Sequence, residues 1–478
     1  MRVPSFTPVF LVLLLSSVLA ACSGGGDSSN AGAPNGASAP SGASTPDHPT
    51  QPPASQLSAK AQLGKALFFD RSLSKNGNMS CASCHDPAFA YGPPNNLAVQ
   101  LGSDATQSGV RAVPSLRYKD MTPAYSDQAM NPDGITGSAP GGGFMLDGRA
   151  PSLSAQAAFP LLNPIEMANA SQSAVVTAIQ SGPSAAAFRT VYGSDVFANV
   201  EQAFSDAGDA LQAFQVEDPS FHPYTSKWDL VQGHKTGGVF TAAEKRGLAL
   251  FNNTVTGAGC AACHYAGANF GGASGLMTDF TYQTLGAPRN PAIPANSNPQ
   301  YYDMGLCGPD TTIHLPQAGQ DDPYCGAFKV PTLRNVTTRS TFFHNGVFHS
   351  IEQVLNFYNT RDTNPEYWYP STGGSGTPVA APGWALVPSY VPGAQIQVFN
   401  DLPPQFQGNV DEELPMGQGQ TSQGGATASD GALARQFHSQ PQLTQQNIAD
   451  LVCFLKTLND GYQVPAQAPT SGPCVDQE

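Results

Sequence analysis

Charged side chains are scarce in this sequence. Asp, Glu, Lys and Arg make up only 12% of the 478 residues, about half of the share usual in soluble proteins. Basic residues are the scarcer kind, with 21 Lys and Arg against 35 Asp and Glu, so the formal net charge is -14 at pH 7. Nucleic acids and anionic membrane surfaces repel an acidic protein, and the sequence therefore predicts neither as a partner.

The apolar run at the start of the chain, residues 9–21, is too short to span a bilayer and is typical of a signal peptide. It ends in a Leu-Ala-Ala-Cys run at Cys22, which resembles a bacterial lipobox. An ordinary secretory signal with a chance cysteine is the alternative. We expect residues 1–21 to be a lipoprotein signal peptide and Cys22 to carry the lipid, as the only membrane contact of a periplasmic Gram-negative protein. The residue after that cysteine is Ser23 rather than Asp, which is similar to the pattern of lipoproteins sorted to the outer membrane.

Large apolar side chains are almost absent from residues 22–55, which are mostly Gly, Ala, Ser and Pro. This composition cannot bury enough surface to fold, so we expect a disordered tether. The whole chain contains 49 Gly and 42 Pro. Such a content favours long loops wrapped around a central group rather than regular structure.

Cysteine occurs in a specific pattern, because a Cys-x-x-Cys-His run appears twice. The residues that would bind haem are Cys81, Cys84 and His85 in the first copy, and Cys260, Cys263 and His264 in the second. Two cysteines three apart share one helical face, where each can form a thioether to a haem vinyl group while the adjacent histidine ligates the iron. A thioredoxin-like redox pair or half of a zinc site is the alternative for a single Cys-x-x-Cys. Since the whole pentapeptide recurs in an exported chain, the sequence predicts two covalently bound haem c groups.

The cysteines outside these roles suggest disulfides. The chain has 9 Cys, and subtracting one lipid anchor and four haem attachments leaves Cys307, Cys325, Cys453 and Cys474. An oxidising periplasm permits disulfides, and four cysteines allow three pairings. The local solutions, Cys307 with Cys325 and Cys453 with Cys474, are favoured, but the sequence alone leaves the pairing open.

The segments before the two motifs also repeat. A helix is expected over about residues 57–69, and Thr241 with Glu244 forms a capping box that opens another helix before the second motif. Residues 63–68 align with residues 246–251. This repetition indicates an internal duplication at the scale of a domain.

The boundary between the two copies is expected near residues 216–238. We therefore assign residues 56–225 to an N-terminal haem domain and residues 226–478 to a C-terminal haem domain. Within the latter, residues 371–430 form a Pro/Gly-rich insertion with little periodicity, where partners often bind. Thr444 is expected to cap a helix near the C-terminus.

Several further motifs lie in a fixed order around the two Cys-x-x-Cys-His runs. They are Asp-Gly-Arg-Ala-Pro-Ser-Leu at residues 147–153, Gln156, Pro160, Asn-Pro-Ile-Glu-Met at 163–167, Lys-Val-Pro-Thr-Leu-Arg-Asn-Val at 329–336 and Phe-His-Asn-Gly at 343–346. Together they resemble the bacterial dihaem cytochrome c peroxidase family, to which the MauG-type maturation enzymes also belong. The resemblance runs from about residue 57 to 460. It implies a mainly α fold of two cytochrome c-like haem domains with long loops, related by the internal duplication.

The resemblance implies that the first haem, in the N-terminal half, reacts with hydrogen peroxide. Its proximal ligand would be His85. Gln156 and Glu166 match the family's distal pair in type and spacing, Glu166 as the acid-base group and Gln156 as the hydrogen-bonding residue. Pro160 and Pro164, which lie between them, are expected to break any single helix, so that both side chains turn toward one cavity. Because no histidine lies between His85 and His222, the first haem is expected to be open, as in the MauG-type branch.

The second haem would store or relay an oxidising equivalent. The residue fourteen after His344 is Tyr358, which matches the tyrosine of the MauG-type branch, where classical peroxidases have methionine. A helix capped by Ser350 would put Tyr358 on its inward face, so a core aromatic is the alternative to an iron ligand. As a ligand beside His264, an anionic oxygen would stabilise a higher iron oxidation state more than a thioether does.

Three departures from the family pattern limit what is carried over. Leu146 stands where the family has a tryptophan between the haems, so a relay there would need another aromatic residue such as Phe144 or Trp228. Ala112 replaces an asparagine that contributes to a calcium site, and the cation of Arg339 stands near the expected backbone ligands. Calcium is therefore not expected.

The sequence thus predicts a hydrogen-peroxide-dependent dihaem oxidoreductase that forms high-valent haem and oxidises a protein or peptide partner. One alternative is a defensive peroxidase that takes electrons from a small cytochrome c or copper protein. Another is a non-catalytic dihaem electron carrier, although a carrier needs no distal acid-base pair. The oxidised partner, the electron donor and the oligomeric state are not evident from the sequence.

Overall fold

The computed structural model describes residues 57–130, 138–253, 258–266, 275–311, 313–314, 322–411, 441–466 and 472–475. The expected signal peptide, Cys22 and the tether lie outside these residues, as does the expected insertion beyond residue 411. The described residues belong to one compact unit. Among their helices, none has the length and apolar character needed to cross a membrane.

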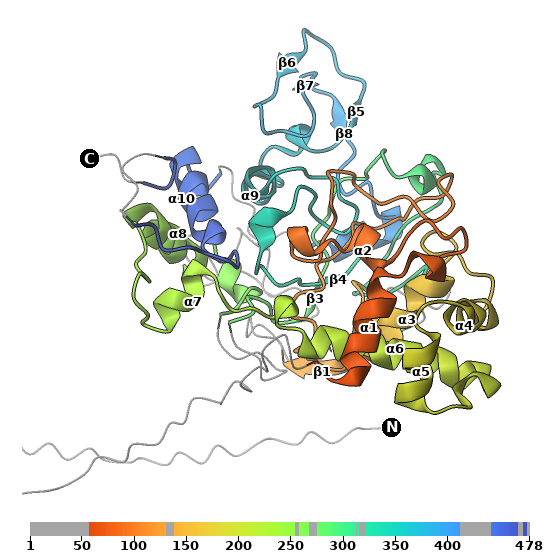
Figure 1. The fold of residues 1–478 in the computed structure, drawn as a ribbon. Coiled ribbons are helices and arrows are strands. Elements are labelled where there is room, and N and C mark those ends of the chain that lie inside the picture. The colour runs from red at the N-terminus through yellow and green to blue at the C-terminus, as the bar shows by residue number, and fades with distance from the viewer. Residues whose placement is uncertain are drawn as a thin grey trace, which may run out of the picture. The chain divides into compact units, whose positions relative to one another are not determined.

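Helices dominate the described residues, which confirms the predicted mainly α class (Figure 1). The α-helices are α1 Ala59–Phe69, α2 Cys81–Cys84, α3 Leu153–Leu162, α4 Gln172–Ser181, α5 Ala185–Tyr192, α6 Val200–Glu217, α7 Lys227–Gln232, α8 Ala242–Asn252, α9 Ile351–Thr360 and α10 Gln445–Lys456. The short 3-10 helices are η2 Arg71–Leu73, η3 Pro87–Phe89, η4 Val196–Ala198, η5 Pro219–Phe221, η6 Cys260–Ala262, η7 Pro294–Ser297, η8 Val336–Thr338, η9 Pro365–Tyr367 and η10 Pro404–Asn409.

Strands occur only as short antiparallel pairs within the described residues. β1 Ser126–Met130 pairs with β2 Ser138–Gly141, β3 Tyr282–Gln283 with β4 Phe328–Lys329, β5 Ser371–Thr372 with β8 Gln395–Ile396, and β6 Val379–Ala380 with β7 Ser389–Tyr390. The last two pairs lie in the predicted insertion and form a projection beside α9 (Figure 1).

The duplication inferred from the sequence is visible in two helix crossings. Gly64 of α1 packs so closely on α6 that a Cβ atom there would lie 1.8 Å from the carbonyl oxygen of Ala210. Gly247 of α8 packs on α10 in the same way, with a Cβ only 2.0 Å from the carbonyl oxygen of Asp450. In each copy, the helix that precedes the Cys-x-x-Cys-His run in the sequence therefore uses a glycine to bring its backbone into contact with a second helix.

The buried apolar side chains form two large clusters. One lies entirely between Leu63 and Phe221, and the other entirely between Trp228 and Leu458. In the first, the ring of Phe68 meets that of Phe214 at 5.5 Å between centroids. Phe251 and Phe454 make the corresponding contact in the second at 5.0 Å, so the duplicated helices present matching aromatic residues to their cores.

The predicted helix starts agree with the structure. The side chains of Ser58, Thr241, Ser350 and Thr444 each accept a hydrogen bond from a backbone amide in the first turn of the helix that follows. This contact satisfies a donor that the helix itself cannot pair. No single helix spans Gln156 and Glu166, as expected from Pro160 and Pro164, because α3 ends at Leu162; it does continue through Pro160. Proline removes only one hydrogen bond, to the carbonyl of Gln156, and the following turn of the helix still closes.

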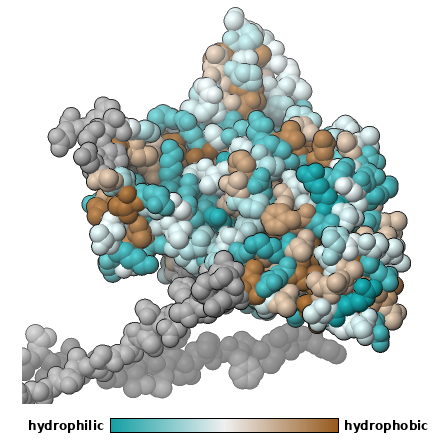
Figure 2. Space-filling view, viewed as in Figure 1, coloured by the Kyte–Doolittle hydropathy of each residue, from teal (hydrophilic) through white to brown (hydrophobic). Residues whose placement is uncertain are grey.

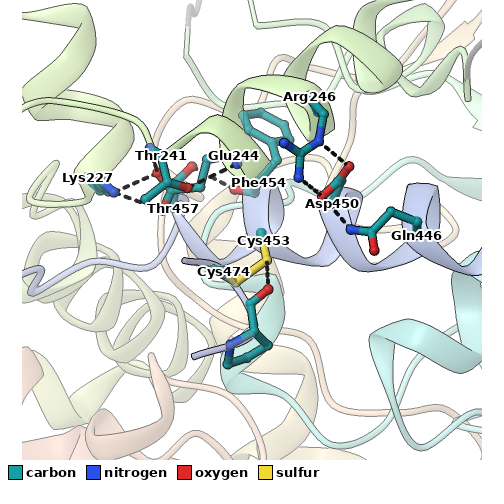
Figure 3. The surroundings of a disulfide bond; sticks show 11 residues. Lys227, Thr241, Glu244, Arg246, Gln446, Asp450, Cys453, Phe454, Thr457 and Cys474 are labelled. Carbon is teal, nitrogen blue, oxygen red and sulfur yellow. Dashed lines mark hydrogen bonds and ion pairs between the residues drawn. A yellow bond between two sulfur atoms is a disulfide. The ribbon is translucent and has the colours of Figure 1, made fainter. Parts of the chain in front are cut away.

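Both favoured disulfides are present, Cys307 with Cys325 and Cys453 with Cys474. The second joins α10 to the C-terminal segment (Figure 3). Beside it, Arg246 of α8 holds the buried carboxylate of Asp450 through two hydrogen bonds of 2.8 and 2.9 Å. The two helices that carry the second copy of the duplication are thus fixed by an ion pair as well as by packing.

Candidate active site

The first Cys-x-x-Cys-His run forms one helical turn. Cys81 and Cys84 are the ends of α2, and His85 follows as its cap. The Nδ1 atom of His85 donates to the carbonyl oxygen of Tyr91 at 3.1 Å, which leaves Nε2 available for a metal. Burial lowers the pKa of His85 to about 4, so the imidazole is neutral, as iron ligation requires.

The second run begins as a 3-10 turn, Cys260–Ala262, rather than an α-helical one, but its histidine makes the matching contact. The Nδ1 atom of His264 donates to the carbonyl oxygen of Met277 at 3.0 Å, and burial lowers the pKa of His264 to about 4. Cys260 and Cys263 form no disulfide, and neither do the two cysteines of the first run. All other described cysteines are in disulfides, so these four are the ones available for attachment to haem.

Glu166 lies near the first run. Burial raises the pKa of Cys81 to about 12 and that of Cys84 to about 11, and the negative charge of Glu166 adds a smaller increase to each. Burial also raises the pKa of Glu166, against the opposing influence of Arg149 and of a hydrogen bond from Asn163. A carboxyl with a raised pKa beside the haem attachment is suited to accept and return a proton.

The backbone around Glu166 is held by a neighbouring loop. The amide of Ser103 donates to the carbonyl oxygen of Glu166 at 2.6 Å. Gly102 approaches so closely that a Cβ there would lie 2.7 Å from the carbonyl oxygen of Ile165. Nothing in the sequence around Gly102 signals this contact, because it joins segments that lie far apart along the chain.

Gln156 lies on α3 and is half-buried. It lines a cavity of about 270 Å³ that also reaches the second Cys-x-x-Cys-His run, whereas Glu166 is not part of that lining. Gln156 is thus near the junction between the two sites. The structure brings Glu166 to the first run and Gln156 to the shared cavity, and no hydrogen bond joins these two residues within the described chain.

The second site lies in the same largely apolar cavity. Cys260, Cys263, His264 and Tyr358 all line it. Tyr358 projects from α9 together with Ile351, Val354 and Leu355, which line the same cavity as the predicted inward face requires. Phe343 and Phe357 pack against the ring of Tyr358 at 5.7 and 6.0 Å between centroids. Burial raises the pKa of Tyr358, so its phenol needs a nearby cation to ionise.

Leu146 lines the same cavity between the two sites, and so does Phe144. Trp228 does not; it packs against Phe240 and Phe454 in the second cluster. Of the two aromatic residues that could replace the missing tryptophan, only Phe144 lies on the cavity wall.

Four cations line the cavity. Arg334 is paired with Asp229, and the other three are Arg339 and two lysines that no sequence pattern selects, Lys119 and Lys329. Removal from water lowers the pKa of Lys119 to about 8 and lowers the pKa values of Lys329 and Arg339. Among the described residues, no carboxylate forms an ion pair with any of the three. Buried cations without carboxylate partners favour a nearby anion, which the propionates of a bound haem would supply.

The region expected to have lost calcium contains a cation of the protein itself. The guanidinium of Arg339 donates to the carbonyl oxygens of Val113 at 3.1 Å and Thr341 at 3.3 Å. Ala112 beside Val113 offers no side-chain oxygen. The absence of calcium stays a prediction.

Comparison with known proteins gives a consistent result. A family model described as di-haem cytochrome c peroxidase matches residues 58–236. The methylamine utilization protein MauG of Paracoccus denitrificans is 36% identical over 309 residues, which cover 63% of this chain and 74% of that protein. The cytochrome c551 peroxidase of Nitrosomonas europaea is 28% identical over 312 residues, covering 64% and 75%. The crystal structure of the diheme peroxidase BthA from Burkholderia thailandensis matches with a TM-score of 0.65 and 32% identity, covering 87% of this chain and 88% of that one.

The chain therefore belongs to the di-haem cytochrome c peroxidase family, and its similarity to MauG supports the MauG-type branch. It is an enzyme of the dihaem peroxidase or MauG-like type. Haem is its cofactor class, and the donor set fits two haems: neutral histidines whose Nδ1 is occupied by a carbonyl, paired thiols, an apolar cavity and buried cations without a carboxylate partner among the described residues.

Proposed function

We propose that the protein uses hydrogen peroxide to oxidise a protein or peptide partner, in the manner of MauG-type enzymes. Each haem would be attached covalently, through Cys81 and Cys84 at the first site and through Cys260 and Cys263 at the second. The observation that carries this proposal is the position of Tyr358, which lines one cavity with His264 and the second pair of cysteines. The bound haems would supply iron that accepts the two oxidising equivalents of peroxide.

In this proposal Glu166 moves the proton. Cleavage of peroxide requires a proton to leave the near oxygen and to reach the departing one. The influence of Glu166 on Cys81 and Cys84 supports its proximity to the first haem. Gln156 would donate a hydrogen bond to the bound oxygen, and His85 would be the ligand on the opposite face.

Tyr358 would make the second site different from the first. A phenol oxygen on the iron blocks the position that peroxide would need, so the second site would hold an oxidising equivalent without reacting directly. The packing of Phe343 and Phe357 on the ring supports this role because it fixes the orientation of Tyr358.

The wider organisation is part of the same proposal. A boundary near residue 225 is supported by the two apolar clusters, which do not overlap in sequence. A lipid on Cys22 would hold the two haem domains in the periplasm, at the outer membrane. Electron donors and partners would then reach the enzyme from solution.

The acid-base role is tested by replacing Glu166 with glutamine in the holoprotein. We expect Glu166→Gln to slow the spectral reaction with peroxide by about 10²- to 10⁴-fold in stopped-flow measurements. Glu201→Gln, an exposed change in the first turn of α6, is the matched control. A wild-type rate in Glu166→Gln would refute the assignment.

The nature of the two sites is tested by electron paramagnetic resonance of the resting enzyme. One high-spin and one low-spin ferric haem are expected, and two low-spin signals would contradict an open first site. Steady turnover of peroxide with a reduced small cytochrome c, and no oxidation of any polypeptide, would instead favour a defensive peroxidase.

A further inference from the structure

A series of aromatic rings leads from Tyr358 into the insertion. The distances between successive ring centroids are 6.0 Å for Tyr358 to Phe357, 5.4 Å for Phe357 to Trp368, 5.5 Å for Trp368 to Trp384, 5.7 Å for Trp384 to Tyr367 and 5.9 Å for Tyr367 to Tyr390. We name these six residues the aromatic series. It includes two of the three tryptophans in the chain.

The series runs from the core to the surface. Trp368 is fully buried, whereas Trp384, Tyr367 and Tyr390 are half-buried. Because tryptophan and tyrosine are the side chains that lose an electron most readily, their order from inside to outside gives an oxidising equivalent a path to solvent. Phe357 is the one ring in the series that is hard to oxidise, and it only separates Tyr358 from Trp368.

The surroundings of Trp368 suit a radical that keeps its proton. Its indole Nε1–H donates to the hydroxyl oxygen of Thr360 at 2.9 Å. That hydroxyl in turn donates to the carbonyl oxygen of Asn356 at 2.7 Å, so no base is positioned to remove the indole proton. The ring of Trp384 stacks on Trp368 with an angle of 22° between the planes, which allows positive charge to be shared by two π systems.

The outer part of the series is attached firmly to α9. The side chain of Gln353 donates to the carbonyl oxygen of Trp384 at 3.2 Å. The amides of Leu386 and Val387 both donate to the carbonyl oxygen of Tyr367, at 3.0 and 2.9 Å. These bonds keep the rings in contact although they belong to a Pro/Gly-rich segment.

The surface around the end of the series is uncharged. Residues 371–400 contain no Asp, Glu, Lys, Arg or His, in a chain whose net charge is -14. Val379 and Val398 are exposed there, and hydrophobic residues are visible on this projection at the top of Figure 2. An acidic enzyme that presents a neutral, partly apolar projection is suited to a partner with an uncharged face.

We propose that the aromatic series is a redox relay between the second haem site and a polypeptide partner that docks on residues 371–400. This inference rests on the proposed function, because peroxide is the oxidant. In each step Trp384 loses one electron to the oxidised second site, and the indole radical cation regains one electron from the partner's oxidisable side chain through Tyr390. When Tyr390 is oxidised, its phenolic proton passes to water and returns on reduction. Two such transfers, with two protons, complete the reduction of one peroxide to water.

The relay is tested in the holoenzyme by adding peroxide without a partner. The wild-type protein should show an aromatic radical and should acquire oxygen at Trp384 or Tyr390, located by peptide mass spectrometry. In Trp384→Phe the oxidised state, followed by its visible spectrum, should decay about tenfold more slowly, and oxidation of Tyr390 should be lost. Tyr390→Phe is the second variant, in case Trp384→Phe does not fold. It keeps the aromatic ring at the surface and should lose the modification at residue 390.

Trp228→Phe is the matched control, since Trp228 lies in the same apolar cluster but outside the aromatic series. It should behave as wild type. If peroxide changes the Soret spectrum but Trp384→Phe decays and is modified like wild type, the relay is refuted while the proposed function stands. If peroxide leaves the Soret spectrum of every variant unchanged, the proposed function fails and the relay fails with it.

Discussion

The carboxyl of Glu166 has a raised pKa, so its ionisation affects the stability of the fold as well as proton transfer at the first site. A carboxyl whose pKa is higher in the folded than in the unfolded protein stabilises the fold fully at low pH, and this contribution is lost as the pH rises through the raised pKa. Glutamine cannot ionise. We therefore expect Glu166→Gln to match the wild-type melting temperature at low pH and to exceed it by a few degrees above the raised pKa.

Thermal unfolding over a series of pH values measures this difference. Equal melting temperatures at every pH would show that the carboxylate is well solvated or fully paired. The prediction is independent of peroxide, so it separates the environment of Glu166 from its role in catalysis.

The role of Tyr358 as an iron ligand can be tested by removing a single atom, its phenol oxygen. Tyr358→Phe keeps the ring that packs on Phe343 and removes only the phenol oxygen. We expect the second haem to become accessible to cyanide, so that titration followed by visible spectra shows an additional binding site compared with wild type. Tyr192→Phe, in the other apolar cluster, should leave cyanide binding unchanged. An unchanged titration in Tyr358→Phe would mean that the tyrosine is a core aromatic.

The residues that sequence patterns could predict are those whose spacing carries the chemistry. Cys81, Cys84 and His85 are adjacent in the chain, and Tyr358 lies at helical spacing from its neighbours. Lys119 could not be selected, because an isolated lysine forms no sequence pattern. Only the structure shows that it is buried in the cavity without a carboxylate partner among the described residues. Trp384 was missed for the same reason, since its importance depends on contacts with Trp368 that are formed by folding.

At the scale of elements, the crossing of α1 with α6 at Gly64 and that of α8 with α10 at Gly247 can be compared by their contributions to stability. An alanine Cβ at Gly64 or Gly247 would lie 1.8 or 2.0 Å from a facing carbonyl oxygen, so the helices must separate. We expect Gly64→Ala and Gly247→Ala each to lower the free energy of unfolding by about 2 kcal/mol or more.

Denaturant titration of the holoprotein measures both changes. Gly408→Ala, where an added Cβ meets nothing within 4 Å, is the control and should stay within about 0.5 kcal/mol of wild type. A small effect at Gly247 with a large one at Gly64 would mean that the two crossings are not equivalent in the protein.

The elements themselves were predictable where a cap and a periodic apolar face coincide. Thr444 and the apolar residues after it define α10, and Thr241 with Glu244 defines the start of α8. Pro160 alone does not end α3, because it removes only the hydrogen bond to the carbonyl of Gln156; the helix ends at Leu162, before Pro164. The strand pairs of the insertion were not predictable, since two residues are too few for an alternating pattern.

For the whole molecule, Asp460 is one of the buried polar contacts that join its two halves, as is the ion pair between Arg111 and Asp303. The carboxylate of Asp460 accepts hydrogen bonds from Arg117 at 3.2 Å, from Tyr118 at 2.8 Å and from Asn335 at 2.6 Å. The side chain of Asp460 is only 2% exposed. Arg117 and Tyr118 follow the first haem motif, whereas Asn335 and Asp460 follow the second, so one buried carboxylate joins the surroundings of both sites.

Removing this charge should therefore weaken the contact between the two halves. Asp460→Asn keeps the shape but leaves Arg117 without a charged partner, and we expect the free energy of unfolding to fall by about 3 kcal/mol. Calorimetry of the holoprotein should also show a broader transition, because the two apolar clusters would no longer unfold together. Asp209→Asn, at an ion pair with Lys60 in which both side chains are about 40% exposed, should cost no more than about 0.5 kcal/mol. Similar losses for the two variants would mean that the two halves are held together by the other contacts between them rather than by Asp460.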